Sequence, residues 1–301
     1  MNSNHRSQLF AFMCIAPSIA CAQDPWQMNA SVTAMTGNYA NSLTMNKQKG
    51  LGLRISGELN QTWGFTAGLQ STRIDMAPIT QVSTQNQDNW LLSGYAHKQS
   101  AMLPGRWTFQ IDAHRVHHDA PQSITSDVRV IAPQVTWLSY TQPVKVDISY
   151  ANSTYKNTAP IHQLSSAISY GFNDAKDWLH VRGYAINNLT ASEALGQSRT
   201  RASDIKLTHF LSSNLKWAPS TVTVGLERGQ RIYVVDMTSH TVYNLPMRNQ
   251  GGKNISASWK LSPQSNLDVQ FSKNNYEANP TPLPVHSFTL STLSAQIATA
   301  W

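Results

Sequence analysis

Histidine and charged residues gather most densely between His114 and Asp119, where three histidines, one arginine and one aspartate stand within six residues. Imidazole and carboxylate groups are the ligands that zinc prefers, but a site needs three or four of them converging on one point. This spacing supplies no compact set of that kind. The sequence therefore predicts no metal site and favours a solvated loop.

A hydrolase would need a nucleophile and a base held side by side. His286 and Ser287 are neighbours in the chain, as are His118 and Asp119. Adjacent side chains of an extended strand point to opposite faces, so neither pair could act together. No catalytic constellation is recognisable, and the sequence predicts a protein that is not an enzyme.

Residues 1–22 have the order of a secretory signal peptide, with Arg6, an apolar stretch from Leu9 to Ala20 and the small-residue site Ala20-Cys21-Ala22. The apolar stretch is too short to span a bilayer as a helix. We expect cleavage before Gln23, which would remove both cysteines of the chain and with them any disulfide or thiol chemistry. A lipoprotein box ending at Cys21 is the alternative, but Ser18 stands where that motif usually has leucine.

Composition narrows the class of protein further. The chain has 23 basic and 16 acidic residues without a basic run, which argues against nucleic-acid binding. Mean hydropathy is −0.34, and beyond the signal peptide no apolar run approaches the ~18 residues that a membrane helix needs. A periplasmic protein, an extracellular protein and an outer-membrane barrel all remain, and only the strand pattern separates them.

Apolar and polar residues alternate with period two along most of the chain. Leucine and isoleucine from Leu51 to Leu59 alternate with residues that include Arg54 and Glu58, and the same pattern recurs from Trp107 to His114 and from Val144 to Tyr150. This period is typical of strands with one apolar and one polar face.

Short turns and longer polar stretches also alternate. The turns lie near residues 60–62, 99–105, 141–143, 173–177, 213–220 and 262–265, and the longer stretches near 37–48, 77–86, 117–127, 152–161, 187–202, 230–252 and 275–286. These thirteen connections predict fourteen strands. Twelve or sixteen remain alternatives, because Pro133 and His209 interrupt two of the proposed strands.

The C-terminal segment carries apolar residues on one face and ends on an aromatic residue, with Leu293, Ile297 and Trp301 in phase. Phe288 and Leu290 have the opposite phase, so we expect a bulge or register change near Ser291. The segment resembles the C-terminal recognition strand of Gram-negative outer-membrane barrels, which the assembly machinery reads. Aromatic residues beside the short turns suit an interfacial girdle, which favours this architecture over a soluble sandwich.

The resemblance implies an all-β fold, a transmembrane antiparallel up-and-down β-barrel of about fourteen strands over residues 23–301, after the signal peptide. It implies an outer-membrane location, with membrane lipid, the barrel assembly machinery and periplasmic chaperones as partners. In such a barrel the polar face lines the lumen. The face assignment places these candidates there: Arg54, Glu58, Asp112, His114, Lys145, Asp147, His180, Arg182, Lys206, Glu227, Lys260 and Asp268.

These charges can form salt bridges that fill a narrow interior, or they can line a water-filled constriction with weak ion preference. We expect Lys260 and Asp268 to face each other across a hairpin. The long segment from Arg228 to Gly251 is predicted to be an ordinary surface loop, with an inward-folded constriction as the alternative.

Passive, porin-like diffusion of small hydrophilic solutes is the predicted function. The alternative is a non-conducting barrel that supports export or assembly of a surface polysaccharide, and a barrel phospholipase or protease comes third. No cofactor is implied, and small solutes or glycans are the candidate ligands.

Overall fold

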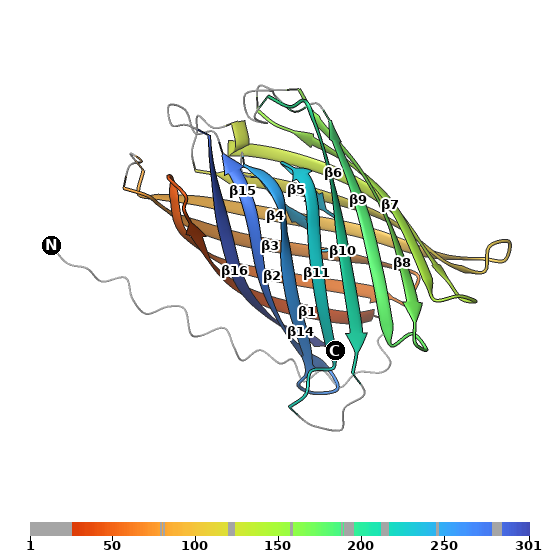
Figure 1. Cartoon of the computed structure of the whole chain (residues 1–301). Coiled ribbons are helices and arrows are strands. Elements are labelled where there is room, and N and C mark those ends of the chain that lie inside the picture. The colour runs from red at the N-terminus through yellow and green to blue at the C-terminus, as the bar shows by residue number, and fades with distance from the viewer. Residues whose placement is uncertain are drawn as a thin grey trace.

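The computed structural model describes residues 26–78, 80, 82–119, 124–156, 159–187, 189, 196–211, 217–244, 247–278 and 285–301. Fourteen strands form one closed barrel (Figure 1). Each pairs antiparallel with its neighbours along the chain, and β1 (Trp26–Ala40) pairs with β16 (His286–Ala300) from Asn29↔Ala300 to Ala40↔Thr289 to close the ring. The predicted fold class and strand number are confirmed, while the predicted signal peptide lies outside the described residues.

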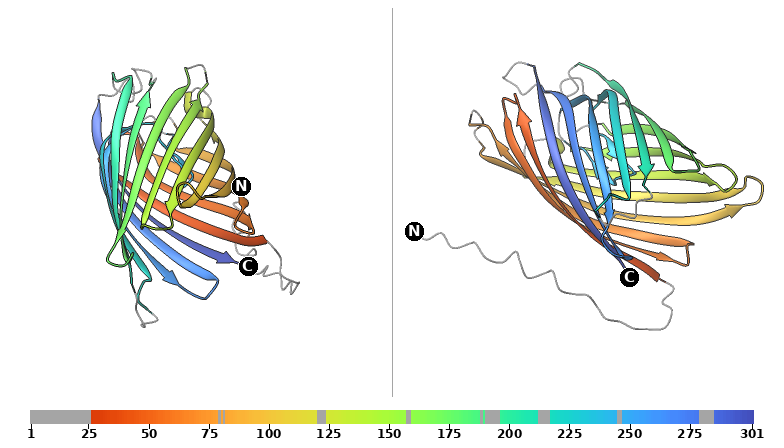
Figure 2. Two further views of the ribbon diagram at one scale, coloured as in Figure 1. Left: turned by 90° about the vertical axis from the view of Figure 1, so that its right-hand side faces the viewer. Right: turned by 60° about the horizontal axis from the view of Figure 1, so that its bottom comes forward.

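Within the described residues, two connections between barrel strands contain regular structure. One has a three-residue 3₁₀ turn, η1 (Ile124–Ser126), and the other has two short strands, β12 (Val235–Asp236) and β13 (Thr241–Val242), which form a separate hairpin. The barrel is visible from two further directions in Figure 2. Its strands are β1 (Trp26–Ala40), β2 (Met45–Leu59), β3 (Trp63–Met76), β4 (Thr84–Ser100), β5 (Gly105–His118), β6 (Asp127–Ser139), β7 (Val144–Thr154), β8 (Ile161–Phe172), β9 (Asp177–Asn187), β10 (Arg199–Phe210), β11 (Thr221–Arg231), β14 (Arg248–Lys260), β15 (Ser265–Ala278) and β16 (His286–Ala300).

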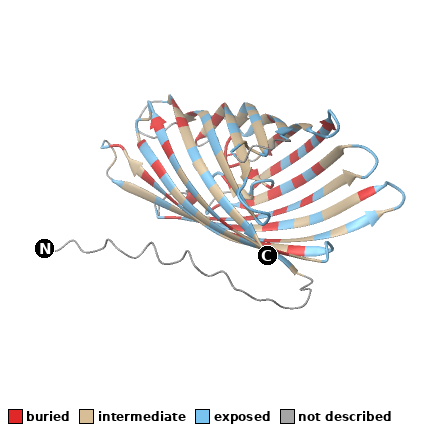
Figure 3. Cartoon of the chain, turned by 90° about the horizontal axis from the view of Figure 1, so that it is seen from below, coloured by how far each residue is buried: buried red, intermediate tan, exposed pale blue. Residues whose placement is uncertain are grey.

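Apolar side chains cover the outside of the barrel, and the inward-facing side chains are polar except in two apolar clusters inside it. On β7, for example, Ile148 is 56% exposed, whereas its neighbours Asp147 and Ser149 are 1% and 3% exposed. Viewed from below, buried and exposed residues alternate along the strands (Figure 3). A soluble sandwich would bury its apolar face, so this arrangement is that of a barrel whose outer surface suits lipid. Within the described ranges, no helix combines the length and the apolar character needed to cross a membrane.

The connections lie at two ends, which we call the turn end (with both strand termini Trp26 and Ala300) and the loop end. Two predicted boundaries are wrong. The polar stretch 37–48 is mostly strand, because β1 continues to Ala40 and β2 begins at Met45. The expected turn 213–220 is longer than predicted, since β10 ends at Phe210 and β11 begins at Thr221.

The bulge expected near Ser291 is also absent, because β15 and β16 keep one register from Ser265↔Thr299 to Ala278↔His286. Phe288 and Leu290 therefore point into the barrel, where they are 3% and 8% exposed. They belong to an apolar cluster inside the loop end, made of Tyr39, Met45, Ile74, Met247, Tyr276, Ala278, Phe288 and Leu290. The change of phase at Leu290 thus marks where the interior becomes apolar, not where the strand is irregular.

Two bulges occur where β11 and β14 leave the regular wall. The register shifts between Arg228 and Arg231 on β11 and between Asn249 and Gly251 on β14. Gly229 and Gly251 have φ of 93° and 113°, a region that side chains disfavour. Because a bulge bends and twists its strand, this pair redirects the chain between the two strands.

The Gly251 bulge gives a testable prediction. A Cβ at Gly251 would lie 2.5 Å from the backbone oxygen of Glu227. We expect Gly251→Ala to lower the free energy of unfolding by about 1–3 kcal/mol, because strained backbone and a steric clash would be added. Urea unfolding followed by tryptophan fluorescence measures this. Gly183→Ala is the matched control, since a Cβ at Gly183 would meet nothing within 4 Å; equal midpoints for both variants would contradict the prediction.

Candidate functional site: a loop folded into the barrel

Residues 232–244 and Met247, which lie between β11 and β14, fold into the barrel, and we call them the inner loop. The run Ile232-Tyr233-Val234-Val235 is buried. Burial of such apolar side chains away from water is favourable, and the inner faces of β5 to β9 supply the matching surface. The cluster comprises Val116, Val128, Val130, Ala132, Ala151, Tyr155, Ile161, Tyr184, Ile186, Leu189, Ile232, Tyr233, Val234, Val235, Met237 and Val242.

The prediction of an ordinary surface loop for this segment is therefore wrong, and the inward-folded alternative is correct. Exposing the apolar surface of these four residues to water is unfavourable, so the segment packs where the barrel interior is apolar. That run, together with Val128 and Val130 in inward phase, was the signal that sequence reasoning did not use.

The tip of the inner loop is the hairpin of β12 and β13. Asp236 Oδ1 accepts a hydrogen bond from the backbone N–H of Thr238 at 2.9 Å, which fixes the turn. Burial raises the pKa of Asp236, but the charges of Lys206 and Arg182 and the N–H groups of the turn outweigh it, so this pKa lies below its ordinary value. The carboxylate thus stabilises the tip at neutral pH, and this stabilisation is lost as the pH falls through its lowered pKa.

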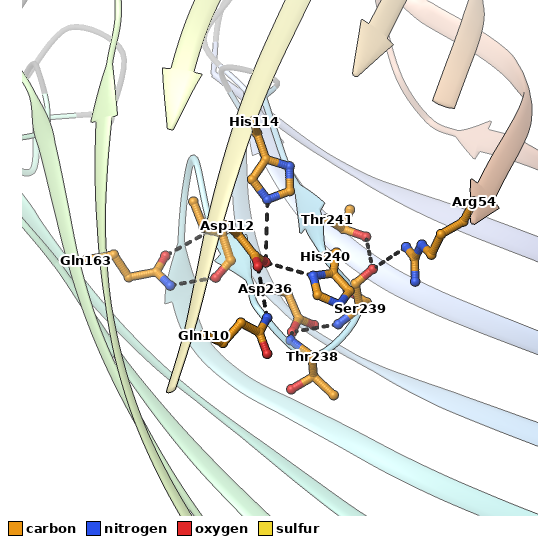
Figure 4. A network of polar contacts seen from close by, with 11 residues as sticks. Arg54, Gln110, Asp112, His114, Gln163, Asp236, Thr238, Ser239, His240 and Thr241 are labelled. Atoms are coloured by element: carbon orange, nitrogen blue, oxygen red, sulfur yellow. Dashed lines mark hydrogen bonds and ion pairs between the residues drawn. The ribbon is translucent and has the colours of Figure 1, made fainter. Parts of the chain in front are cut away.

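Four anchoring contacts hold the inner loop to the wall, and Figure 4 shows those made by Gln163, Arg54 and Asp112. The wall residues that make them come from four different strands. Gln163 on β8 donates to the Val235 carbonyl at 2.6 Å and accepts from its N–H at 3.0 Å, Arg182 Nη2 on β9 donates to Thr238 Oγ1 at 2.9 Å, Arg54 Nη2 on β2 donates to the Ser239 carbonyl at 2.9 Å, and His240 Nδ1 lies 2.7 Å from Asp112 Oδ2 on β5.

The anchoring contacts span the lumen. Arg54 on β2 and Arg182 on β9 stand seven places apart in the fourteen-strand ring, that is, on opposite walls. Their partners, Ser239 and Thr238, are consecutive residues of the loop tip. The tip therefore bridges the barrel from side to side, which is the geometry of a constriction.

Ion pairs reinforce the wall around the tip. Arg182 Nη2 lies 2.8 Å from Asp147 Oδ1, with both side chains buried, and the pair reaches across β8 at Ala167, whose small side chain leaves room. Lys206 pairs with Asp204 at 2.9 Å, and Arg231 pairs with Glu227. Removing one partner of the buried Asp147–Arg182 pair would leave an uncompensated charge in a low-dielectric interior, which is costly.

A cavity of about 600 Å³ lies between the inner loop and the inner faces of β1–β4 and β14–β16. About half of its lining residues are amides, hydroxyls and glycines, the others are apolar, aromatic or charged, and the loop contributes Ser239 and Asn244 to it. The loop thus fills the β5–β9 side of the lumen and leaves a compartment of mixed polar and apolar lining on the other.

The charged and histidine residues predicted to line the lumen fall into three groups by solvent exposure. Asp112, His114, Asp147 and Arg182 are buried; Lys260 is exposed; the half-buried ones are Arg54, Glu58, Lys145, His180, Lys206, Glu227 and Asp268. The structure brings Asp147 to Arg182 and places Asp112 Oδ2 3.9 Å from His114 Nε2. That these residues line a conducting pore stays a prediction.

The prediction that Lys260 and Asp268 face each other across the hairpin is wrong. The register places Lys260 opposite Asn266 and Asp268 opposite Ser258, whose hydroxyl hydrogen-bonds the carboxylate. The turn occupies residues 261–264 instead of the expected 262–265. Moving a hairpin turn by one residue along the chain shifts every cross-strand partner by two residues.

The histidine-rich stretch is not a solvated loop, because β5 continues to His118. His114 and His118 are buried inside while His117 is exposed outside, so the strand divides the group between two faces. Within the described part of the chain, no three residues of the metal-ligating types come together. His286 and Ser287 likewise differ in face, as expected for β16.

Comparison with known proteins shows that the fold of this chain is similar to that of several solved structures. No protein-family model and no curated protein sequence matches the chain. Among solved structures, the toluene transporter TodX of Pseudomonas putida is 10% identical, with 93% of this chain and 90% of that chain covered and a TM-score of 0.53. The CymD monoaromatic hydrocarbon channel is 10% identical, with 93% and 89% covered and a TM-score of 0.56.

A third structure, described as a bacterial polysaccharide outer membrane secretin, is 12% identical, with 91% of this chain and 98% of that chain covered and a TM-score of 0.50. Sequences this different share a fold and not necessarily a function. The closed ring, the outward apolar face and these likenesses together give one conclusion: the chain has the β-barrel fold of bacterial outer-membrane channels.

Proposed function

We propose that this protein lies in the outer membrane and conducts small hydrophilic solutes through a lumen that the inner loop narrows. The membrane location is supported by the outward apolar face and by ring closure, which leaves no unpaired strand edge inside the bilayer. The fold likeness to TodX and CymD supports a channel. We also expect the C-terminal strand, with Leu293, Ile297 and Trp301 exposed on the outer face, to serve as the assembly signal.

The polar cavity beside the inner loop carries the proposal. TodX is a toluene transporter and CymD a monoaromatic hydrocarbon channel, whereas amides and hydroxyls are the most numerous groups lining this cavity. Moving an apolar solute past such groups would strip them of water without replacing their hydrogen bonds, which is costly. A hydrophilic solute replaces those bonds, so the lining favours it.

The test is single-channel recording with the refolded chain from Gln23 in a planar bilayer. We expect small, reproducible steps, because a cavity of about 600 Å³ remains beside the inner loop. Detergent carried through the same refolding without protein is the control. A stable, closed barrel that gives no steps would overturn the proposal.

Export of a surface polysaccharide is the second candidate, and one observation favours it: the likeness to the polysaccharide secretin accompanies a cavity rich in amides and hydroxyls. Deleting the gene and staining surface glycan separates the two candidates. Loss of surface glycan, together with silent bilayers, would favour export over diffusion.

A further inference from the structure

The cavity beside the inner loop contains polar atoms that lack partners. Gln87, Asn89 and Asn244 line it, and their side-chain oxygens are buried and accept no hydrogen bond from the described part of the chain. Asn89 is 7% exposed and Asn244 is 1% exposed. A buried acceptor without a donor costs free energy, so these three oxygens mark where a donor group is missing.

A hydrogen bond made by the nitrogen of the Asn244 side-chain amide identifies the oxygen of that amide as the atom without a donor. Its amide nitrogen donates to the carbonyl of Thr125 at 2.9 Å, and rotating the amide by half a turn would lose that bond. Gln87 and Asn89 share the inward face of β4, opposite Thr72 and Gln70 of β3. The cavity therefore presents two neighbouring amides from the wall and one from the loop.

Several charged side chains around the cavity have a charged or ionisable partner, and two have neutral ones. Arg231 pairs with Glu227 and His240 contacts Asp112, whereas Arg54 donates to the neutral Ser239 carbonyl and Asp236 accepts from backbone N–H groups. Lys206 is paired with Asp204. No described charged side chain of the wall strands β3, β4, β15 or β16 lines the cavity, so the lining offers an acid or a cation no counter-charge on that side.

The loop end of the cavity is aromatic. Tyr39 and Tyr276 line it, and Tyr276 stacks on Phe288 with ring centroids 5.5 Å apart. An apolar platform joined to a few polar groups is the usual lining of a small-molecule site, and about 600 Å³ lies within the usual range of ~300–1,000 Å³.

We infer that this cavity binds a neutral, hydroxyl-rich solute, a sugar unit or short oligosaccharide. Its hydroxyls donate to the oxygens of Gln87, Asn89 and Asn244, and its apolar ring face packs toward the tyrosines. The inference names the solute class for the channel and in that sense rests on the proposed function.

Calorimetric titration with maltotriose tests the inference, using the folded barrel in a detergent that contains no sugar. We expect saturable binding, and a glucuronic-acid oligosaccharide of equal length should bind at least about tenfold more weakly. Asn89→Leu should weaken maltotriose binding about tenfold, since one hydrogen bond to a buried amide is removed.

Gln134→Leu is the matched control, because Gln134 is an equally buried inward amide with an unpartnered oxygen that does not line this cavity. Equal weakening by both substitutions, equal binding of the acidic sugar, or heats of dilution alone with every sugar would each overturn the inference. Bilayer recordings on the same sample separate the two proposals. Steps without sugar binding would refute only the ligand class, and sugar binding by a silent barrel would refute only conduction.

Discussion

Replacing residues 233–244 with a short Gly-Ser linker will raise the single-channel conductance severalfold. The wild-type tip bridges opposite walls through Arg54 and Arg182, so its removal opens the section that limits ion flow. The strands that the linker joins, β11 and β14, are already paired neighbours, and the ring can close without the loop.

Gln163→Ala is the graded companion to this deletion, because it removes only the twin hydrogen bond to Val235. We expect it to leave the small steps in place and to add brief larger openings, as the loop detaches transiently from β8. Bilayer recordings at one salt concentration compare the three proteins. A deletion variant with the step size of the wild type would show that the loop is not the constriction.

Asp147→Ala will lower the free energy of unfolding by about 3–5 kcal/mol, the usual cost of leaving one partner of a buried ion pair uncompensated. Arg182 would keep its bond to Thr238 but lose the only described carboxylate with which it forms an ion pair, in a site where its side chain is 3% exposed. Urea unfolding of the refolded barrel, followed by tryptophan fluorescence, measures the change.

The double variant Asp147→Leu, Arg182→Met is the control, because it removes both charges and replaces them with apolar side chains. We expect it to regain most of the lost stability, since no unpaired charge remains. If the single variant unfolds at the wild-type urea concentration, the pair does not contribute as its burial implies. A double variant as unstable as the single one would point to packing instead of charge.

The sequence carried enough information to predict the barrel but not its interior. Alternation such as that around Ile148 is a local signal, because a strand fixes the face of each residue independently of its partners. Thirteen connections could therefore be counted without knowing any contact. Register is less local, and a turn one residue off at each side was enough to misplace the partner of Asp268.

The inner loop depends on contacts that no local pattern contains. His240 meets Asp112 across 128 residues, and Gln163 meets Val235 across 72. Neither Gln163 nor Ser239 carries a charge or a motif, so sequence reasoning passed over both. The phase change at Phe288 was visible, but its cause, an apolar cluster inside the loop end, required the three-dimensional neighbours of Phe288.

The most direct test of the inner loop is the size of reagent that reaches it. Ser239→Cys, in a chain beginning at Gln23 and so without native cysteine, should react with a small methanethiosulfonate because Ser239 is exposed to the cavity, but not with a polymer-linked maleimide. Lys156→Cys, at an exposed position between β7 and β8, should react with both reagents. Labelling of Ser239→Cys by the polymer as readily as Lys156→Cys would place the loop outside the barrel and contradict the account.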